Sequence, residues 1–257
     1  MSKHISIFDF GKGLIETGDL DPVYTLLLNS NFKKSSLKRF LVAYLCFYNV
    51  GTACYVIEGG TSKDFYKRLE YAFENNFPRN AERRHFRGDA GRTSIKEFKK
   101  KFKHPEDAIS KLETCRTFGE VEKIVREYAG FGKWAVFKLA DLLERVMGYD
   151  IDFSDCRLSI YSEPVKAARM TFPSYTLDKA VEILEAYFSR FDAPPKNDRK
   201  INVQEVETIL CKYKSYLNNS YHIGKDIEEL KKTLFEKKIV DNVYLRKLQD
   251  SYKQNFK

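Results

Sequence analysis

The chain has 257 residues, of which 43% are hydrophobic and 32% charged, as in an ordinary soluble globular protein with one large domain or two lobes. No apolar run reaches the roughly 18 residues of a membrane span, and the first residues lack the apolar core of a signal peptide, so we expect a cytoplasmic protein with no membrane partner. The 45 Lys and Arg residues outnumber the 36 Asp and Glu residues, an excess that favours polyanions such as nucleic acid but also occurs in proteins that bind none.

Apolar residues recur at steps of three and four over nearly the whole chain, which predicts an all-α fold. No turn signal such as Asn-Gly separates alternating runs, so no β-hairpin is expected. The expected helices begin at caps near Ser35 or Ser36 and at Ser62, and two more flank residues 130–132. The later ones cover residues 177–191, 203–217, 226–235 and 241–253.

The domain organisation follows from one clear linker, "DAPPKNDRKI" at residues 192–201, whose adjacent prolines cannot continue a helix. Residues 1–34 are expected to form an N-terminal extension and residues 35–191 the core. A helical segment, 202–257, opens with a predicted Asn202–Glu205 capping box and packs back on the core. The five cysteines form no C-x-x-C pair, which argues against a zinc ribbon or iron–sulfur cluster and indicates free thiols.

The sequence "GFGK" lies between two predicted helices and forms a helix-hairpin-helix pattern. Gly130 and Gly132 permit positive φ and a close approach of the backbone to a ligand. The first N–H groups of the second helix form a natural phosphate seat, and Lys133 adds a positive charge beside it. This pattern predicts DNA-backbone binding, although a plain turn that ends a helix produces the same spacing.

A dense basic segment, "PRNAERRHFRGDAGR", occupies residues 78–92. One helical turn would gather Arg83, Arg84 and Arg87, whose guanidinium groups match phosphate oxygens, and His85 can donate a hydrogen bond or a proton. Gly88 and Gly91 in the same segment favour a tight loop. The segment predicts a di- or triphosphate site; the alternatives are a solvated basic face or a DNA-backbone patch.

A third polar group lies at residues 206–230, where a helix with Lys212 and Lys214 leads into a turn with Tyr221 and Lys225. Polar groups that converge at a helix start can hold a small charged ligand. Ordinary surface lysines give the same spacing.

The spacing from the hairpin to "DIDFSD" resembles that of the helix-hairpin-helix DNA glycosylases. That resemblance implies an all-α fold of two lobes with a groove between them, and a catalytic carboxylate at Asp155, with Asp152 as the register-shifted rival. Trp134 stands where bifunctional members carry their Schiff-base lysine, so lyase chemistry is not expected. The four-cysteine cluster of some members is absent. A solvated loop is the alternative for these aspartates.

Four segments together resemble the bacteriophage amino acid:DNA transferases, also called α-glutamyl/putrescinyl thymidine pyrophosphorylases. They are "CFYNVGTACYVIE", "PRNAERRHFRG", "GFGKWAVFKLADLLERVMGYDIDFSD" and "ETILCKYKSYLNNSYHIGKDI", within roughly residues 36–235. The resemblance implies double-stranded DNA carrying pyrophosphorylated 5-hydroxymethyluracil as one substrate, and a free amino acid or polyamine as the other. The amine displaces pyrophosphate and becomes attached to the methylene carbon of the base.

Physical roles can be assigned within that reaction. The arginines with His85 would stabilise the departing pyrophosphate, and Asp155 or Asp152 would bind the ammonium of the amine and take its proton. Lys212, Lys214 or Lys225, beside Tyr221, would hold the carboxylate of an amino acid. No cofactor is indicated, and assistance by Mg²⁺ is left open.

Two other functions fit parts of the pattern. A monofunctional DNA glycosylase would use Asp155 to stabilise an oxocarbenium ion but would need no pyrophosphate site, so the arginine cluster argues against it. A non-enzymatic DNA-binding helical protein would tolerate the loss of Asp155.

Overall fold

The computed structural model describes residues 4–80 and 86–256. Helices account for 63% of the chain, and the described residues contain no β-strand; Asp192 and Lys200 form an isolated bridge. The expectation of an all-α fold is therefore confirmed. Within the same residues, no helix combines the length and the apolarity needed to cross a bilayer.

The chain divides into two compact units, each built from two separate stretches of sequence. The first unit contains the residues up to Thr25 and Asp152–Glu229, and the second contains Leu26–Ile151 and the residues from Leu230 onward. These boundaries differ from those expected from linker composition, because tertiary contacts attach both chain ends to distant segments. The proline-containing segment 192–201 lies inside the first unit.

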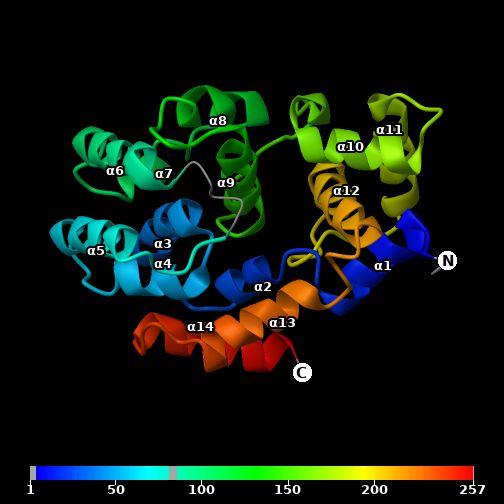
Figure 1. The fold of residues 1–257 in the computed structure, drawn as a ribbon. Coiled ribbons are helices and arrows are strands. Elements are labelled where there is room, and N and C mark those ends of the chain that lie inside the picture. The colour runs from blue at the N-terminus through cyan, green and yellow to red at the C-terminus, as the bar shows by residue number, and fades with distance from the viewer. Residues whose placement is uncertain (1–3, 81–85, 257) are drawn as a thin grey trace. The chain divides into compact units, whose positions relative to one another are not determined.

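The first unit is a group of helices around α12 (Val203–Leu217), which packs against α1 (Ile7–Thr17), α10 (Ser162–Thr171) and α11 (Leu177–Phe188) (Figure 1). A short 3-10 helix, η2 (Leu158–Ile160), precedes α10, and α2 (Pro22–Leu28) and α13 (Lys225–Lys231) cross the unit boundaries. The predicted capping box of Asn202 and Glu205 is present, and α12 has the predicted bounds.

Close packing of α1 in the first unit depends on a glycine. A Cβ atom at Gly11 would lie 2.3 Å from the ring of Phe188 and 3.2 Å from Ile209. Since real Cβ atoms do not approach other atoms so closely, Gly11 allows α1 to lie against α11 and α12.

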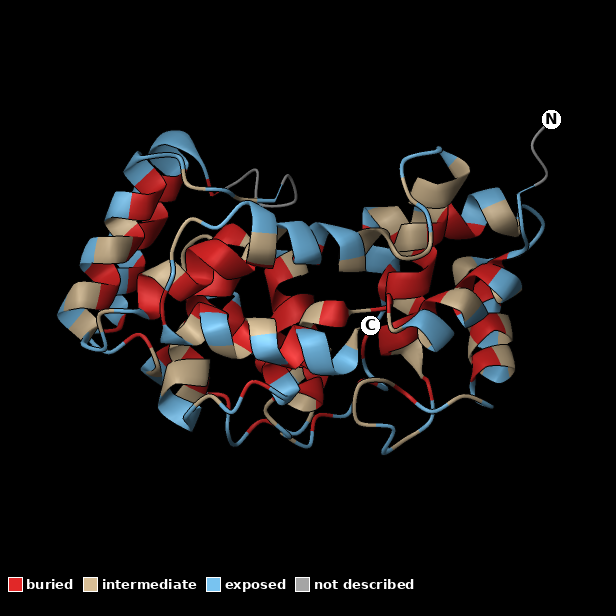
Figure 2. Ribbon diagram, turned by 90° about the horizontal axis from the view of Figure 1, so that it is seen from below, coloured by how far each residue is buried: buried red, intermediate tan, exposed pale blue. Residues whose placement is uncertain are grey.

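The second unit contains most of the helices. They are α3 (Lys34–Phe47), α4 (Val50–Ile57), α5 (Ser62–Glu74), α6 (Gly88–Lys101), α7 (Asp107–Ser110), α8 (Phe118–Val125), α9 (Lys133–Arg145), the π-helix η3 (Lys232–Glu236) and α14 (Val243–Asn255). Figure 2 shows that these helices turn buried residues to one side and exposed residues to the other, as the apolar periodicity predicted.

Several local predictions in the second unit were wrong. Neither Ser35 nor Ser36 caps a helix, since α3 begins at Lys34. Thr61, not Ser62, caps α5 by accepting a hydrogen bond from Asp64 N at 3.1 Å. The expected loop around Gly91 is the first turn of α6, where a Cβ atom at Gly91 would lie 2.4 Å from the ring of Phe73.

The C-terminal helix is attached to the second unit by a buried asparagine. Asn242 caps α14 by accepting from Leu245 N at 2.9 Å, and its amide donates to the Cys54 carbonyl of α4 at 2.9 Å. Both hydrogen bonds are buried, so one side chain satisfies the helix end and joins two helices.

Replacing Asn242 with Ala should lower the free energy of unfolding by about 2–3 kcal/mol, because the substitution removes a cap and leaves a buried carbonyl without its donor. Ser6→Ala, which removes the exposed cap of α1, is the matched control and should cost about 1 kcal/mol or less. Urea denaturation followed by circular dichroism measures both. Equal losses in the two variants would show that the link between α4 and α14 adds nothing.

Candidate functional site

The predicted hairpin lies in the second unit, where α8 and α9 pack together and are joined by a turn. Gly130 has φ 81°, a conformation that favours glycine, and a Cβ atom there would lie 2.8 Å from Ser94 of α6. Phe131 is buried and stacks on Phe98 of α6, with ring centroids 5.6 Å apart. The turn is thus fixed against α6 on both sides of its apex.

Gly130 must be glycine for its backbone conformation and packing, but Gly132 need not be. Its φ is −82°, and a Cβ atom there would have no neighbour within 4 Å. Gly132 is the N-cap of α9 and supplies no side-chain cap to the first N–H groups of that helix. The missing side chain therefore leaves the outer face of the turn open to a ligand, as close approach of a phosphate requires.

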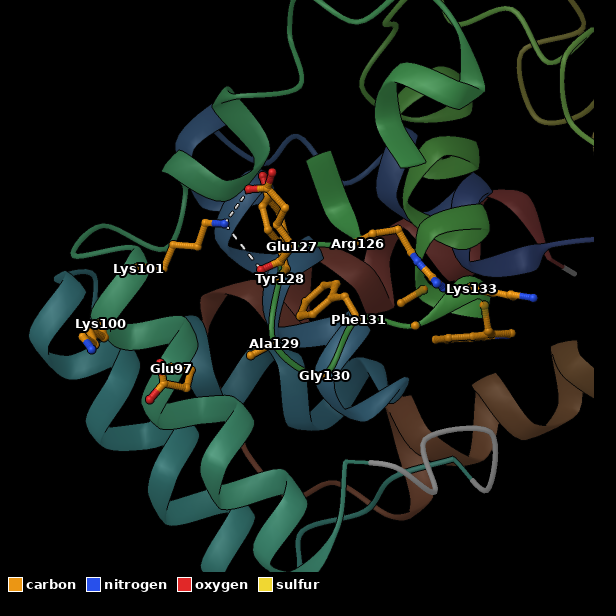
Figure 3. Close-up of a pocket in the computed structure, with 13 residues that line it drawn as sticks. Glu97, Lys100, Lys101, Arg126, Glu127, Tyr128, Ala129, Gly130, Phe131 and Lys133 are labelled. Carbon is orange, nitrogen blue, oxygen red and sulfur yellow. Dashed lines mark hydrogen bonds and ion pairs between the residues drawn. The ribbon is translucent and has the colours of Figure 1, made fainter. Parts of the chain in front are cut away.

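A surface pocket of about 1030 Å³ lies between this turn and the C-terminal half of α6 (Figure 3). Its lining includes exposed cations from three elements: Lys100 on α6, Arg126 after α8, and Lys133 on α9. Lys101 reaches from α6 to Glu127, with Nζ 2.9 Å from Oε2, and this ion pair joins the two walls. We call this hollow the hairpin pocket.

Trp134, the only tryptophan of the chain, also lines the hairpin pocket. It is half-buried and packs edge-to-face against Tyr48, with ring centroids 4.7 Å apart. Tyr48 has φ 51° and separates α3 from α4. Aromatic rings beside exposed cations suit a nucleic-acid strand, since phosphates can contact the charges and bases or sugars can contact the rings.

The basic segment is described only in part. Arg83, Arg84 and His85 lie outside the described residues, so their predicted roles stay predictions. Arg87 is exposed at the N-cap of α6. Phe86 is buried, and a Cβ atom at Gly130 would lie 3.6 Å from its ring. The end of the basic segment is therefore next to the hairpin turn.

The two candidate carboxylates, Asp152 and Asp155, are exposed and lie in a loop of the first unit. Asp152 accepts hydrogen bonds from Ser154 N at 2.8 Å and from Ser154 Oγ at 2.6 Å. These bonds from the Ser154 hydroxyl and amide lower the pKa of Asp152. Because these bonds stabilise the ionised form, the carboxylate of Asp152 is a weaker proton acceptor than an ordinary aspartate.

Among residues 4–80 and 86–256, no group of three His, Cys, Asp or Glu side chains is placed to hold an ion. All five cysteines are free thiols, as expected; burial raises the pKa of Cys54 above its usual value, so this thiol stays protonated.

Comparison with known proteins identifies the family. The sequence model of the amino acid:DNA transferases matches residues 12–221. The chain belongs to this family. It is 35% identical to a glycinyltransferase of Pseudomonas phage PaMx11 over 264 residues, which cover 88% of this chain and 89% of that protein. It is 27% identical to a putrescinyltransferase of Delftia phage PhiW-14 over 234 residues, 85% of this chain and 75% of that protein.

As an amino acid:DNA transferase, the chain is an enzyme that acts on DNA and an amino acid. The sequence placed the amino-acid site at four residues of the first unit, and most of them already contact other groups. Lys212 Nζ lies 2.6 Å from Asp226 Oδ2, and Lys214 is paired with Glu163. Lys225 donates to the Ser220 carbonyl and lies 3.7 Å from Glu229.

Tyr221 leads to a residue that sequence reasoning missed. Its hydroxyl donates to Asp19 Oδ2 at 2.7 Å, and the same carboxylate accepts from Gly224 N at 2.7 Å and Ile227 N at 3.1 Å. Asp19 is fully buried, and its backbone carbonyl accepts from Lys212. In this transferase Asp19 therefore fixes the turn that carries Tyr221 and Lys225.

A signal for Asp19 exists in the sequence. It directly follows Gly18, which ends α1 in the left-handed conformation. A carboxylate beside a helix C-terminus is disfavoured by the helix dipole, so an acidic residue there indicates a tertiary partner. The partner, more than 200 residues away, could not be identified from spacing.

We expect Asp19→Asn to lower the free energy of unfolding by about 2–4 kcal/mol, because an amide nitrogen would face backbone donors that need an acceptor. Tyr221→Phe removes one donor and leaves both amides paired, so it should cost about 1–1.5 kcal/mol. Thermal and urea unfolding of the two variants measure the difference. An Asp19→Asn variant as stable as the wild type would mean that the cluster does not hold the turn.

Proposed function

We propose that this transferase replaces the pyrophosphate of a 5-(pyrophosphoryloxymethyl)uracil base in phage DNA with the amine of an amino acid or polyamine. The observation that carries the proposal is the family match over residues 12–221, together with a basic hairpin pocket inside the matched range. The names of the two phage relatives support a small amine as the transferred group. The reaction belongs in the cytoplasm of the infected host, where phage DNA is modified.

The hairpin would hold the DNA backbone, in a helix-hairpin-helix fold of the DNA glycosylase type. Gly132 leaves the turn open for a phosphate, and Lys133 supplies a cation at the same place. Gly130 contributes by fixing the turn against α6. The target base would be turned out of the duplex, because its methylene carbon is otherwise crowded within the groove.

The chemical step is a substitution at the methylene carbon of the base. The carbon–oxygen bond breaks and its electron pair leaves with pyrophosphate, while the neutral amine nitrogen forms a new carbon–nitrogen bond. Charge develops on the leaving oxygens, where the arginines of the basic segment, Arg83, Arg84 and Arg87, with His85, would stabilise it. The scheme requires no cofactor.

The amine must first lose a proton, because an ammonium has no lone pair to attack with. We assign that role to Asp155, which the spacing from the hairpin favours, with Asp152 as the rival carboxylate. The hydrogen bonds from Ser154 lower the pKa of Asp152 and make it a weaker base than an ordinary aspartate. The proton passes from the ammonium to Asp155 and then to solvent.

An amino-acid substrate also carries a carboxylate, which needs a cation. Lys225 is the best placed of the predicted lysines, because its carboxylate neighbour is 3.7 Å away, whereas Lys212 and Lys214 form close ion pairs. Tyr221 would line this position beside Lys225, with Nζ 5.9 Å from the ring centroid. Glycine is the first amine to test, because the relative at 35% identity is named a glycinyltransferase.

The proposal is tested by incubating the protein with DNA that contains 5-(pyrophosphoryloxymethyl)uracil and with glycine, glutamate, ornithine or putrescine separately. The DNA is then digested to nucleosides for mass spectrometry, and released pyrophosphate is assayed in parallel. We expect an aminomethyl-linked nucleoside and one pyrophosphate per base modified. An abasic site would instead identify a glycosylase, and unaltered DNA that is nevertheless bound would identify a non-enzymatic DNA-binding protein.

Replacing Lys133 with Glu should weaken binding to duplexes of any sequence, because a phosphate contact positions the DNA without reading it. The slope of log affinity against log salt should fall by roughly one unit. Fluorescence anisotropy over a salt series provides the measurement. Lys123→Glu on α8, outside the hairpin pocket, is the control for the same change in net charge; an equal effect there would remove the hairpin from the DNA interface.

The Asp155→Asn and Arg84→Ala variants should respond differently to pH. Arg84→Ala should slow transfer about 100-fold at every pH, because it removes a donor to the leaving group. Asp155→Asn should also be slow but should recover as pH rises, since more amine is then neutral. Asp152→Asn is the matched control and should retain most activity. Equal pH profiles for Asp155→Asn and Arg84→Ala would place Asp155 in another role.

A further inference from the structure

A second, smaller pocket of about 300 Å³ lies in the second unit, where α5 ends and α6 begins. Three arginines from three different places line it: Arg79 after α5, Arg87 at the N-cap of α6, and Arg92 inside α6. We call it the arginine pocket. Its other lining residues are Phe73, Glu74, Asn76, Phe77 and Gly88.

Arg79 is held rigidly at the base of this pocket. Its guanidinium donates to the Phe86 carbonyl at 2.7 Å and to the Phe73 carbonyl at 3.2 Å. It also lies over the rings of Phe73 and Phe47, 5.1 and 5.7 Å from their centroids. These contacts order the side chain but bring no negative charge to it.

The other two arginines differ in how their charge is balanced. Arg92 Nε lies 2.7 Å from Glu74 and Nη1 lies 2.8 Å from Asp89, so its charge is neutralised within the protein. Arg87 is exposed, and among the described residues no carboxylate pairs with Arg87 or with Arg79. Within the part of the chain that the structure describes, two of the three cations therefore have no carboxylate counter-charge.

Arg79 and Arg87 are also close enough to affect each other. Burial lowers the pKa of Arg79, and the positive charge of Arg87 lowers it further. A preordered guanidinium beside a second cation is unfavourable in the empty protein and becomes favourable when an oxyanion with several oxygens bridges them. Phosphate groups have that geometry and charge, and 300 Å³ accommodates one.

We propose that the arginine pocket binds a phosphate group, held by Arg87 and the fixed guanidinium of Arg79. Two sources share this chemistry: the pyrophosphate released in the proposed reaction and a phosphate of the DNA backbone. The first source rests on the proposed function, whereas the second does not. Arg79 adds a positioning role, because its bond to the Phe86 carbonyl fixes the end of the basic segment next to Arg87.

The test measures binding of inorganic pyrophosphate to the full-length protein by isothermal titration calorimetry, without DNA. Arg87→Gln removes an exposed cation that forms no structural hydrogen bond as N-cap, so folding should survive, and affinity should fall about 10-fold or more. Arg92→Gln is the matched control in the same pocket and should change affinity less than 3-fold, since its charge is already neutralised. Arg169→Gln, on α10 of the first unit, controls for net charge.

A second arm separates the two sources. Binding of an unmodified duplex is measured over a salt series for the same variants. Weaker pyrophosphate binding in Arg87→Gln with unchanged duplex binding assigns the pocket to the leaving group. A duplex salt slope that falls by roughly one unit, with no pyrophosphate binding by the wild type, assigns it to a DNA phosphate. If Arg87→Gln alters neither, or no more than Arg169→Gln does, the proposal is overturned.

Arg79→Lys tests the positioning role separately. Lysine keeps the charge but cannot donate in a fork to two carbonyls, so pyrophosphate affinity should fall while the thermal transition remains cooperative. The proposed function can fail without this proposal failing. Transfer of an amine without release of pyrophosphate would contradict the proposed function, but the arginine pocket could still bind phosphate.

Discussion

The buried ring of Phe86 is the contact on which the hairpin pocket and the arginine pocket depend. It packs edge-to-face on Phe47 of α3 and Phe73 of α5, with centroids 5.9 and 5.6 Å away. Its carbonyl is bound by Arg79, and its ring lies beside the position of Gly130 in the hairpin turn. One side chain therefore sets the distance between the basic segment, the hairpin and α6, and burial of so large a ring makes that arrangement costly to change.

The cations of the chain have two different uses, and for the binding of phosphate these uses matter more than the net charge. Some cations are used structurally, such as Lys101 with Glu127 and Arg92 with Glu74. Others line pockets and are exposed, such as Lys133 and Arg87. Paired cations order the walls of a site, whereas solvent-exposed ones are available to an incoming phosphate, so a transferase that acts on DNA needs both kinds.

In the first unit a carboxylate is likewise used to order the structure. Asp19 has no access to solvent, and three donors surround it, so its charge stabilises a turn and is not offered to a substrate. Because Lys212 is tied to the same cluster, the segment around Tyr221 is better ordered than a surface loop of its composition would be. If the proposed amino-acid site lies there, a preordered turn would lower the entropic cost of binding.

The sequence by itself determined the features that depend on short-range periodicity. Helical spacing predicted the all-α fold, and the capping box gave α12 its start, because both arise from residues within one or two turns. The Gly130 turn was predicted for the same reason, and the four sequence segments gave the family. The predicted serine N-caps of α3 and α5 were wrong. Several neighbouring residues can begin a helix, and the tertiary fold selects among them.

Only the tertiary structure decided how the charged residues are used. Spacing cannot distinguish an exposed cation from one paired with a carboxylate distant in sequence, as with Lys214 and Glu163, 51 positions apart. Nor could it connect Asp19 to Tyr221, or Arg79 to the carbonyls on both sides of it. Helix formation depends on neighbours along the chain, whereas the free energy of a charge depends on everything within a few ångströms, and the fold alone determines which residues those are.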